Sequence, residues 1–276
     1  GCGECRILLA EVELARGDPA AALTALATET PATSRVFVLR GRALLLTDRL
    51  QEAADQLTTA LSLQSDLTEA AALAAVVKVR QGNRRGGMEA LRQLERTRGN
   101  DPEVLLALSL ALRAQGLLDQ ARGYAQEAAR LEPSSYRAAT ELCQIEVEAG
   151  FGGPARAACK QALARNPEHL PARRLLARIH AAEGRRADAE TAYRQILEQL
   201  PDDGPARLGL LLVLVDQGKD EEAGRDVVQY SRQLGPSAAL VRGLLAERGG
   251  HLEEAVRELT SATAVPGLTS RAATAL

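Results

Sequence analysis

Large aromatic side chains are almost absent from this sequence of 276 residues. Trp does not occur, and Phe, Trp and Tyr together make up only 2% of the chain. Strand-forming aromatic and β-branched residues are too sparse to build a sheet. Because 46% of the residues are nevertheless hydrophobic, with Ala and Leu prominent, the composition favours a core of closely packed helices.

A strong net charge and a long apolar run are also missing. The formal net charge is −2, so no general attraction to nucleic acid or to an anionic membrane is expected. The longest apolar candidate, residues 208–215, ends at Asp216 and is too short to cross a membrane. We therefore predict no nucleic-acid partner and no membrane span.

A repeat with a period of 34 residues runs along the chain. A glycine, an alanine and a proline recur in the same register at Gly116, Ala121 and Pro133, then Gly150, Ala155 and Pro167, then Gly184, Ala189 and Pro201. Outward extension of this register predicts a single array of eight repeats, at about 3–33, 34–67, 68–101, 102–135, 136–169, 170–203, 204–235 and 236–268. The same register predicts a truncated ninth repeat that starts near residue 269.

Each repeat has the pattern of two helices. Around Gly116 the leucines before it and the alanines after it each follow helical spacing. The glycine ends the first helix in a left-handed conformation, and the proline opens the next repeat. Ala121 marks a close helix crossing, where a larger side chain would push the helices apart.

These features make the chain resemble the tetratricopeptide repeat (TPR) family. The period, the glycine, alanine and proline of the fourth repeat, and Ala189-x3-Tyr193 fit that family. The resemblance implies an all-α, right-handed superhelical solenoid of tandem helix-turn-helix repeats that binds protein and is not an enzyme. The chain departs from the family in lacking Trp and in placing Arg40 and Arg242 where Leu is usual, so the second and eighth repeats are expected to be less regular.

The resemblance also implies that the first helices line a concave groove where partners bind. Helical spacing then predicts a mostly apolar groove with a basic step, formed by Leu106, Leu110, Arg137, Thr140, Gln144, Arg174, Arg178, Leu208 and Leu212. Ala72, Val76, Leu240 and Leu244 extend it. A protein or peptide with apolar anchors and an acidic group would fit. Alternatively, some of these side chains pack against neighbouring repeats.

No catalytic, cofactor-binding or metal-binding residues are predicted. The three histidines are scattered, and the G-x-G-x-x-A pattern that begins at Gly150 lies at a repeat turn between two helices, where a dinucleotide loop would need a preceding strand. Cys2 and Cys5 could form half of a zinc site or a redox pair, but four ligands are needed. Cys143 and Cys159 occupy small buried positions and are expected to be structural thiols.

The sequence therefore predicts a protein-interaction scaffold, most consistent with bacterial complex assembly. One alternative is a periplasmic, lipid-anchored factor in polysaccharide export or pilus biogenesis, because Gly1-Cys2 resembles the end of a lipoprotein signal. Another is the recognition arm of a larger enzyme. The compartment, cytoplasmic or periplasmic, stays open. The ends of the array carry no polar capping helix, which predicts that it continues beyond residue 276 and that this chain can associate end to end.

Overall fold

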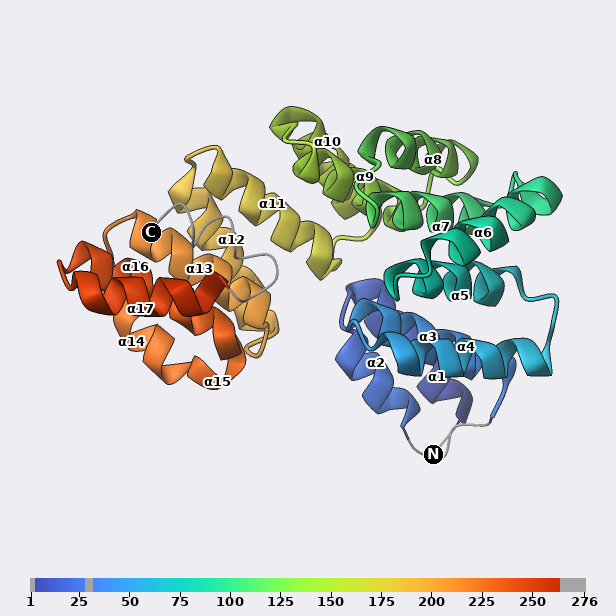
Figure 1. The fold of residues 1–276 in the computed structure, drawn as a ribbon, viewed down its shortest axis with the longest axis horizontal. Coiled ribbons are helices and arrows are strands. Elements are labelled where there is room, and N and C mark those ends of the chain that lie inside the picture. Colours follow the sequence, from blue (N-terminus) through green and yellow to red (C-terminus); the bar gives the residue numbers. More distant parts are fainter. Residues whose placement is uncertain (1–2, 28–31, 264–276) are drawn as a thin grey trace. The chain divides into compact units, whose positions relative to one another are not determined.

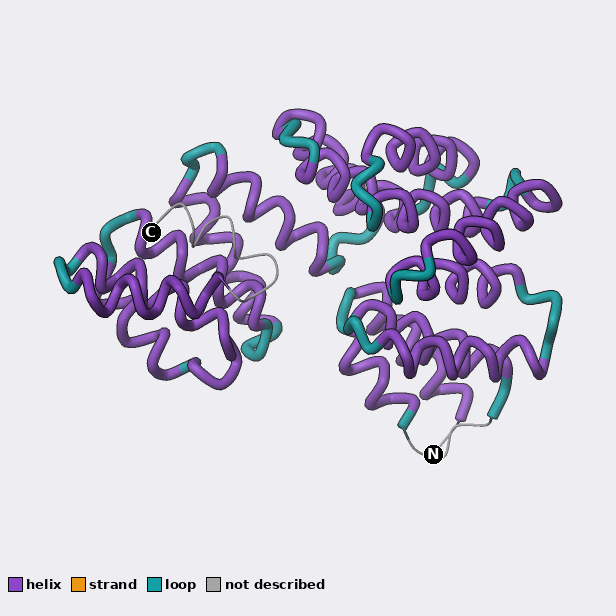
Figure 2. Tube along the Cα trace, viewed as in Figure 1, coloured by secondary structure: helices purple, strands orange, loops and turns teal. Residues whose placement is uncertain are grey.

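The protein consists of helices joined by short loops. The structure is a computed structural model that describes residues 3–27 and 32–263. Within those ranges no strand is present, as Figure 2 shows. This confirms the predicted all-α class. The predicted truncated ninth repeat near residue 269 lies outside the described residues.

The chain divides into two compact units, Gly1–Ala172 and Arg173–Leu276. The first unit stacks five helix pairs and includes the first turn of a sixth (Figure 1). Its helices are α1 (Gly3–Arg16), α2 (Pro19–Leu26), α3 (Ser34–Leu46), α4 (Leu50–Leu63), α5 (Thr68–Arg80), α6 (Arg84–Arg98), α7 (Pro102–Arg113), α8 (Leu118–Leu131), α9 (Tyr136–Glu148) and α10 (Gly152–Arg165). Each of the first five predicted repeats thus contains one helix pair.

The second unit begins inside a helix. Its helices are α11 (Leu170–Ala182), which contains the division between the units, α12 (Arg186–Gln199), α13 (Gly204–Asp216), α14 (Asp220–Gln229), α15 (Ser231–Leu234), the 3-10 helix η1 (Gly235–Ser237), α16 (Ala238–Arg248) and α17 (Leu252–Thr263). The periodicity predicted one continuous array, and nothing in the repeat register distinguishes residue 172 as a division.

The turn between the two helices of a repeat has the left-handed backbone that the glycines predicted. Gly116 has a φ of 77° and Gly150 a φ of 79°. The second repeat has no glycine at this point, and Asp48 adopts a φ of 59° there. An aspartate tolerates this region better than most side chains because its short polar group can bond locally. The turn geometry is therefore retained in all these repeats.

Small residues mark the points where the two helices of a repeat cross. Ala121, Ala155 and Ala189 are each 0% exposed. The third repeat has Gly87 here, and a Cβ on that residue would lie 2.6 Å from the carbonyl oxygen of Ala75. That distance is well inside van der Waals contact, so the crossing excludes larger side chains, as the sequence predicted.

Arg40 and Arg242 stand where the family usually has leucine, and they do not interrupt their helix pairs. The guanidinium of Arg40 donates to the backbone oxygen of Leu26, which lies at the end of α2. Arg242 donates to Glu258 of α17 at 2.8 Å. Both arginines thus use their length to reach a polar acceptor. Helices α3, α4, α16 and α17 all form, although the second repeat turns at Asp48 and the eighth opens with the 3-10 helix Gly235–Ser237.

Cys143 and Cys159 correct one prediction. They are joined in a disulfide bond between α9 and α10, with their Cα atoms 5.1 Å apart, and so they are not separate thiols. The sequence placed both residues correctly at buried positions of the same repeat. It could not show that the helix crossing brings the two Cα atoms within the range that a disulfide spans.

Candidate protein-binding site on the inner face

The first helices of unit 1 lie side by side and form one face of the stack. Helices α1, α3, α5, α7 and α9 contact one another in that order, and the second helices pack behind them against the first helices before and after. We call this surface the inner face. Six charged side chains meet on it and are named here the inner-face cluster: Glu11, Arg35, Arg42, Glu69, Glu103 and Arg137.

Four members of the inner-face cluster occupy the same position of successive repeats. Arg35, Glu69, Glu103 and Arg137 are each the second residue of a first helix. Side-chain caps fix three of these helix starts: Thr33 accepts from the backbone of Val36, and Asp101 and Ser135 cap α7 and α9 in the same way. Because each helix begins at the same point, stacking brings the four side chains into one row.

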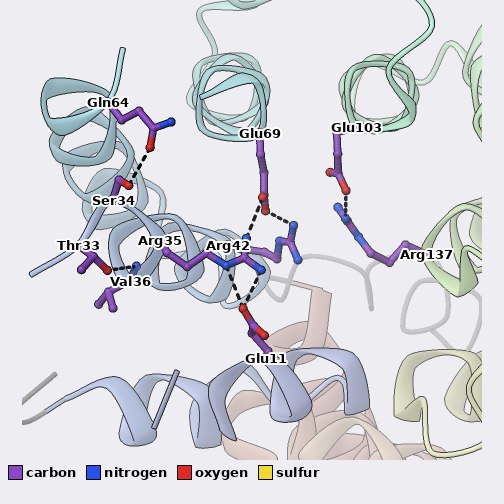
Figure 3. Close-up of polar contacts among 10 residues, drawn as sticks. All are labelled: Glu11, Thr33, Ser34, Arg35, Val36, Arg42, Gln64, Glu69, Glu103 and Arg137. Atoms are coloured by element: carbon purple, nitrogen blue, oxygen red, sulfur yellow. Dashed lines mark hydrogen bonds and ion pairs between the residues drawn. The ribbon is translucent and has the colours of Figure 1, made fainter. Parts of the chain in front are cut away.

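Arg35 connects three repeats. Its Nε and Nη2 atoms donate to Glu11 Oε1 at 2.9 and 2.8 Å, and its Nη1 donates to Glu69 Oε2 at 3.1 Å (Figure 3). Glu69 also accepts from Arg42 through its other oxygen. Both oxygens of Glu69 are therefore engaged, and an arginine fork suits such an acceptor.

Arg42 and Arg137 use fewer of their guanidinium donors than Arg35 does. Arg137 donates to Glu103, and Arg42 donates to Glu69. Burial lowers the pKa of Arg42, and the positive charge of Arg137 lowers it further. Within the described part of the chain, Arg42 Nε is buried and has no hydrogen-bond partner. An additional anion near these two guanidinium groups would therefore be favoured.

A contact between the first and fifth repeats closes unit 1. Asn166 Nδ2 donates to the backbone oxygen of Ala15 at 2.8 Å, and His169 Nδ1 lies 2.8 Å from the same oxygen. Gly17, at the turn that follows α1, packs so tightly on Pro171 that a Cβ would lie 2.2 Å from its Cδ. These contacts join the first repeat to the end of the fifth and to the first turn of α11.

The predicted groove residues are divided between the two units. Leu106, Leu110, Arg137, Thr140 and Gln144 belong to unit 1, whereas Arg174, Arg178, Leu208 and Leu212 belong to unit 2. Of these, only Arg137 is a member of the inner-face cluster. Their role in binding a partner stays a prediction.

Within unit 1 the predicted polar groove residues make local contacts. Thr140 donates to the backbone oxygen of Tyr136, and Gln144 donates to Glu148 at 2.7 Å. In unit 2, Arg174 lies 3.1 Å from Asp203, and Arg178 is exposed. Arg178 is therefore the predicted basic residue most open to a partner.

The predicted apolar groove is largely not open to water. Leu106 is 5% exposed, and Ala72, Val76 and Leu240 are 2% exposed or less. Leu110, Leu208 and Leu212 are half-buried, and Leu212 packs against the core around Leu240. The expectation of an exposed apolar surface is thus wrong for the four buried residues, because neighbouring helices cover their side chains.

Most of the inner-face cluster was missed by helical projection. A signal for it existed in the sequence, because residues 35, 69, 103 and 137 are all charged and are 34 residues apart. The structure shows that two of these steps are direct contacts, Arg35 with Glu69 and Glu103 with Arg137. A comparison of charges at the array period would have found the row.

Neither a metal cluster nor a membrane span occurs in the part of the chain that the structure describes. Across residues 3–27 and 32–263, no group of three or more His, Cys, Asp or Glu side chains is arranged to hold a metal ion. Within the same ranges, no helix combines the length and apolar character that a membrane span requires. Cys2, which carried the zinc and lipid-anchor hypotheses, lies outside the described residues, and Cys5 is exposed.

Stacked helix hairpins with a common register define a helical-repeat protein. The chain belongs to the tetratricopeptide repeat family: two family models with this description match residues 7–68, 72–136 and 154–211. Proteins with this fold are protein–protein interaction scaffolds, and they are generally not catalytic. The comparison with curated proteins returned no match.

Solved structures show the same fold. A thermophilic TPR protein of Thermus thermophilus is 24% identical, with a TM-score of 0.56 over 66% of this chain and 99% of that chain. A tetratricopeptide repeat protein of Parabacteroides merdae is 13% identical, with a TM-score of 0.64 over 88% and 97%. The Cut9–Hcn1 structure is 14% identical, with a TM-score of 0.76 over 94% of this chain and 52% of that chain.

Proposed function

We propose that this protein is an interaction scaffold that binds an acidic partner segment at the inner face of unit 1. The observation that carries the proposal is that the acceptors of Glu69 in the inner-face cluster are used, whereas some arginine donors are not. Glu69 accepts hydrogen bonds through both of its oxygens, whereas the partly exposed guanidinium groups of Arg42 and Arg137 each donate to one glutamate oxygen. The cluster can therefore bind additional hydrogen-bond acceptors. The carboxylates of an acidic peptide supply such acceptors.

Exposure and charge support the same partner. The side chains of Arg42 and Arg137 are 18% and 25% exposed, so a ligand can reach part of each guanidinium group. The positive charge of Arg137 disfavours that of Arg42, and a carboxylate placed beside both would offset this repulsion. An extended acidic peptide is thus a better match for the inner face than a basic one.

A random-peptide phage library selected against the full chain tests this proposal. We expect the recovered peptides to be rich in Asp and Glu and to bind more weakly as salt is raised. Arg42→Gln and Arg137→Gln should each weaken the binding of a recovered peptide about 10-fold or more, since a hydrogen bond to a charged group is lost. Arg130→Gln, on the exposed side of α8 and paired only locally with Glu127, is the matched control and should not change binding.

A variant with the opposite effect separates binding from folding. Glu103→Gln removes the carboxylate that occupies Arg137, so acidic peptides should bind more tightly to this variant than to the parent. Recovery of peptides without acidic residues, or equal binding by the parent and the Arg137→Gln variant, would show that the partner does not use the inner-face cluster. Loss of binding in Arg174→Glu/Arg178→Glu alone would place the partner on unit 2.

A further inference from the structure

The disulfide of the fifth repeat occupies a position at which the other repeats use packing. Cys143 and Cys159 are 16 residues apart, one on each helix of the repeat. The same spacing in the other repeats gives the pairs Ala10/Leu26, Gly41/Leu57, Ala75/Leu91, Ser109/Ala125, Ala177/Tyr193, Leu211/Val227 and Gly243/Leu259. In most of these pairs a small residue on the first helix faces a large one on the second.

This pairing of small and large residues is visible in the contacts. A Cβ on Gly41 would lie 2.6 Å from Leu57 Cγ, and one on Gly243 would lie 2.6 Å from Leu259 Cγ. The leucine therefore fills the space that the glycine leaves at the crossing. In the fifth repeat a covalent bond between two sulfur atoms takes the place of this contact.

The second helix of the fifth repeat, like α8 of the fourth, buries only small side chains. The buried residues of α10 are Ala155, Ala158, Cys159 and Ala162, so no large aliphatic or aromatic side chain is fully buried from this helix. Small side chains bury little apolar area and contribute little hydrophobic stabilisation. A disulfide compensates by restricting the unfolded chain.

The same repeat positions the parts of unit 1 that matter for binding. Helix α9 carries Arg137 of the inner-face cluster, and the loop after α10 carries Asn166 and His169, which close unit 1 onto Ala15. Cys143 and Cys159 are both 0% exposed, so a reductant in solution cannot reach either sulfur without local opening. The geometry is that of a permanent bond and not of an exchangeable one.

We propose that the Cys143–Cys159 disulfide is a permanent structural bond that replaces packing in the fifth repeat, and that this chain matures in an oxidising compartment. In its formation the two thiols lose two protons and two electrons, and the sulfur atoms bond. A disulfide-containing oxidoreductase accepts them and becomes a dithiol. Such bonds persist outside the reducing cytosol, which is why the bond indicates the compartment.

The first experiment asks whether the bond exists in the source cells. The cells are quenched in acid, free thiols are alkylated, and the chain is digested with trypsin without reduction. Cleavage after Arg156 separates the two cysteines into peptides 138–156 and 157–160. We expect these peptides to remain linked. Recovery of both peptides in alkylated form would overturn the proposal.

The second experiment asks whether the bond is structural and permanent. Cys143→Ser/Cys159→Ser should lower the melting temperature by about 6–12 °C. Cys143→Ala/Cys159→Leu copies the Ala75/Leu91 pair and should recover most of the loss. A dithiol reductant should cleave the bond in urea but not in the native chain. An unchanged melting temperature in the serine variant, or ready cleavage in the native chain, would contradict the assignment.

Discussion

The closing contact of unit 1 can be tested at a single glycine. Gly17 has a φ of 90°, a conformation that L side chains rarely adopt. A Cβ on Gly17 would lie 2.2 Å from Pro171 Cδ and 2.7 Å from Pro171 Cγ. Gly17→Ala thus introduces two unfavourable contributions to the folding free energy, one from the backbone conformation and one from overlap with a residue far along the chain.

The two contributions can be separated with a matched control. Gly116 has a similar φ of 77°, but a Cβ there meets nothing within 4 Å. Gly116→Ala should therefore cost only the backbone contribution, about 1–2 kcal/mol of unfolding free energy. Gly17→Ala should cost this amount plus about 1–3 kcal/mol for overpacking. The expected excess of Gly17→Ala over Gly116→Ala is the contribution of the closing contact.

Urea unfolding followed by circular dichroism measures both variants, and amide exchange of residues 166–169 reports on the loop. Gly17→Ala should accelerate exchange there, whereas Gly116→Ala should not. Adding Pro171→Ala to Gly17→Ala should recover part of the loss, because the overlapping ring atoms are removed. Equal destabilisation by Gly17→Ala and Gly116→Ala, with no recovery, would refute the closed arrangement of unit 1.

Two further predictions concern ion pairs. Arg113→Ala removes the partner of Glu141, which is 6% exposed and lies 2.7 Å from Arg113 Nε. We expect the free energy of unfolding, measured in urea, to fall by about 2–3 kcal/mol. Adding Glu141→Gln should recover most of this loss, because no unpaired charge then remains buried. Burial alone would raise the pKa of Glu190, but hydrogen bonds from Lys219, Gln217 and Arg194 lower it to about 2. Its stabilisation is present above pH 4.5 and is lost as the pH falls toward 2, so Glu190→Gln should flatten the acid limb of the stability curve.

The inner-face cluster shows how far sequence reasoning could reach. The first helices and their starting residues follow from capping residues and from the period, so the row at residues 35, 69, 103 and 137 could be placed on one face. Whether neighbouring members of the row attract or remain apart depends on side-chain directions across three helices. Helical projection instead favoured leucines such as Leu106, which the structure buries against adjacent repeats.

The sequence alone determined the helix pairs, the turns at Gly116 and Gly150 and the close crossings at Ala121 and Ala155. These are local features, because each repeat specifies its own caps, turn and crossing within 34 residues. Only the tertiary structure decided the Cys143–Cys159 bond, the contact of Ala15 with Asn166 and the division of the chain within α11. Such contacts depend on small angles between successive helices, which accumulate from repeat to repeat and leave no periodic signal in the sequence.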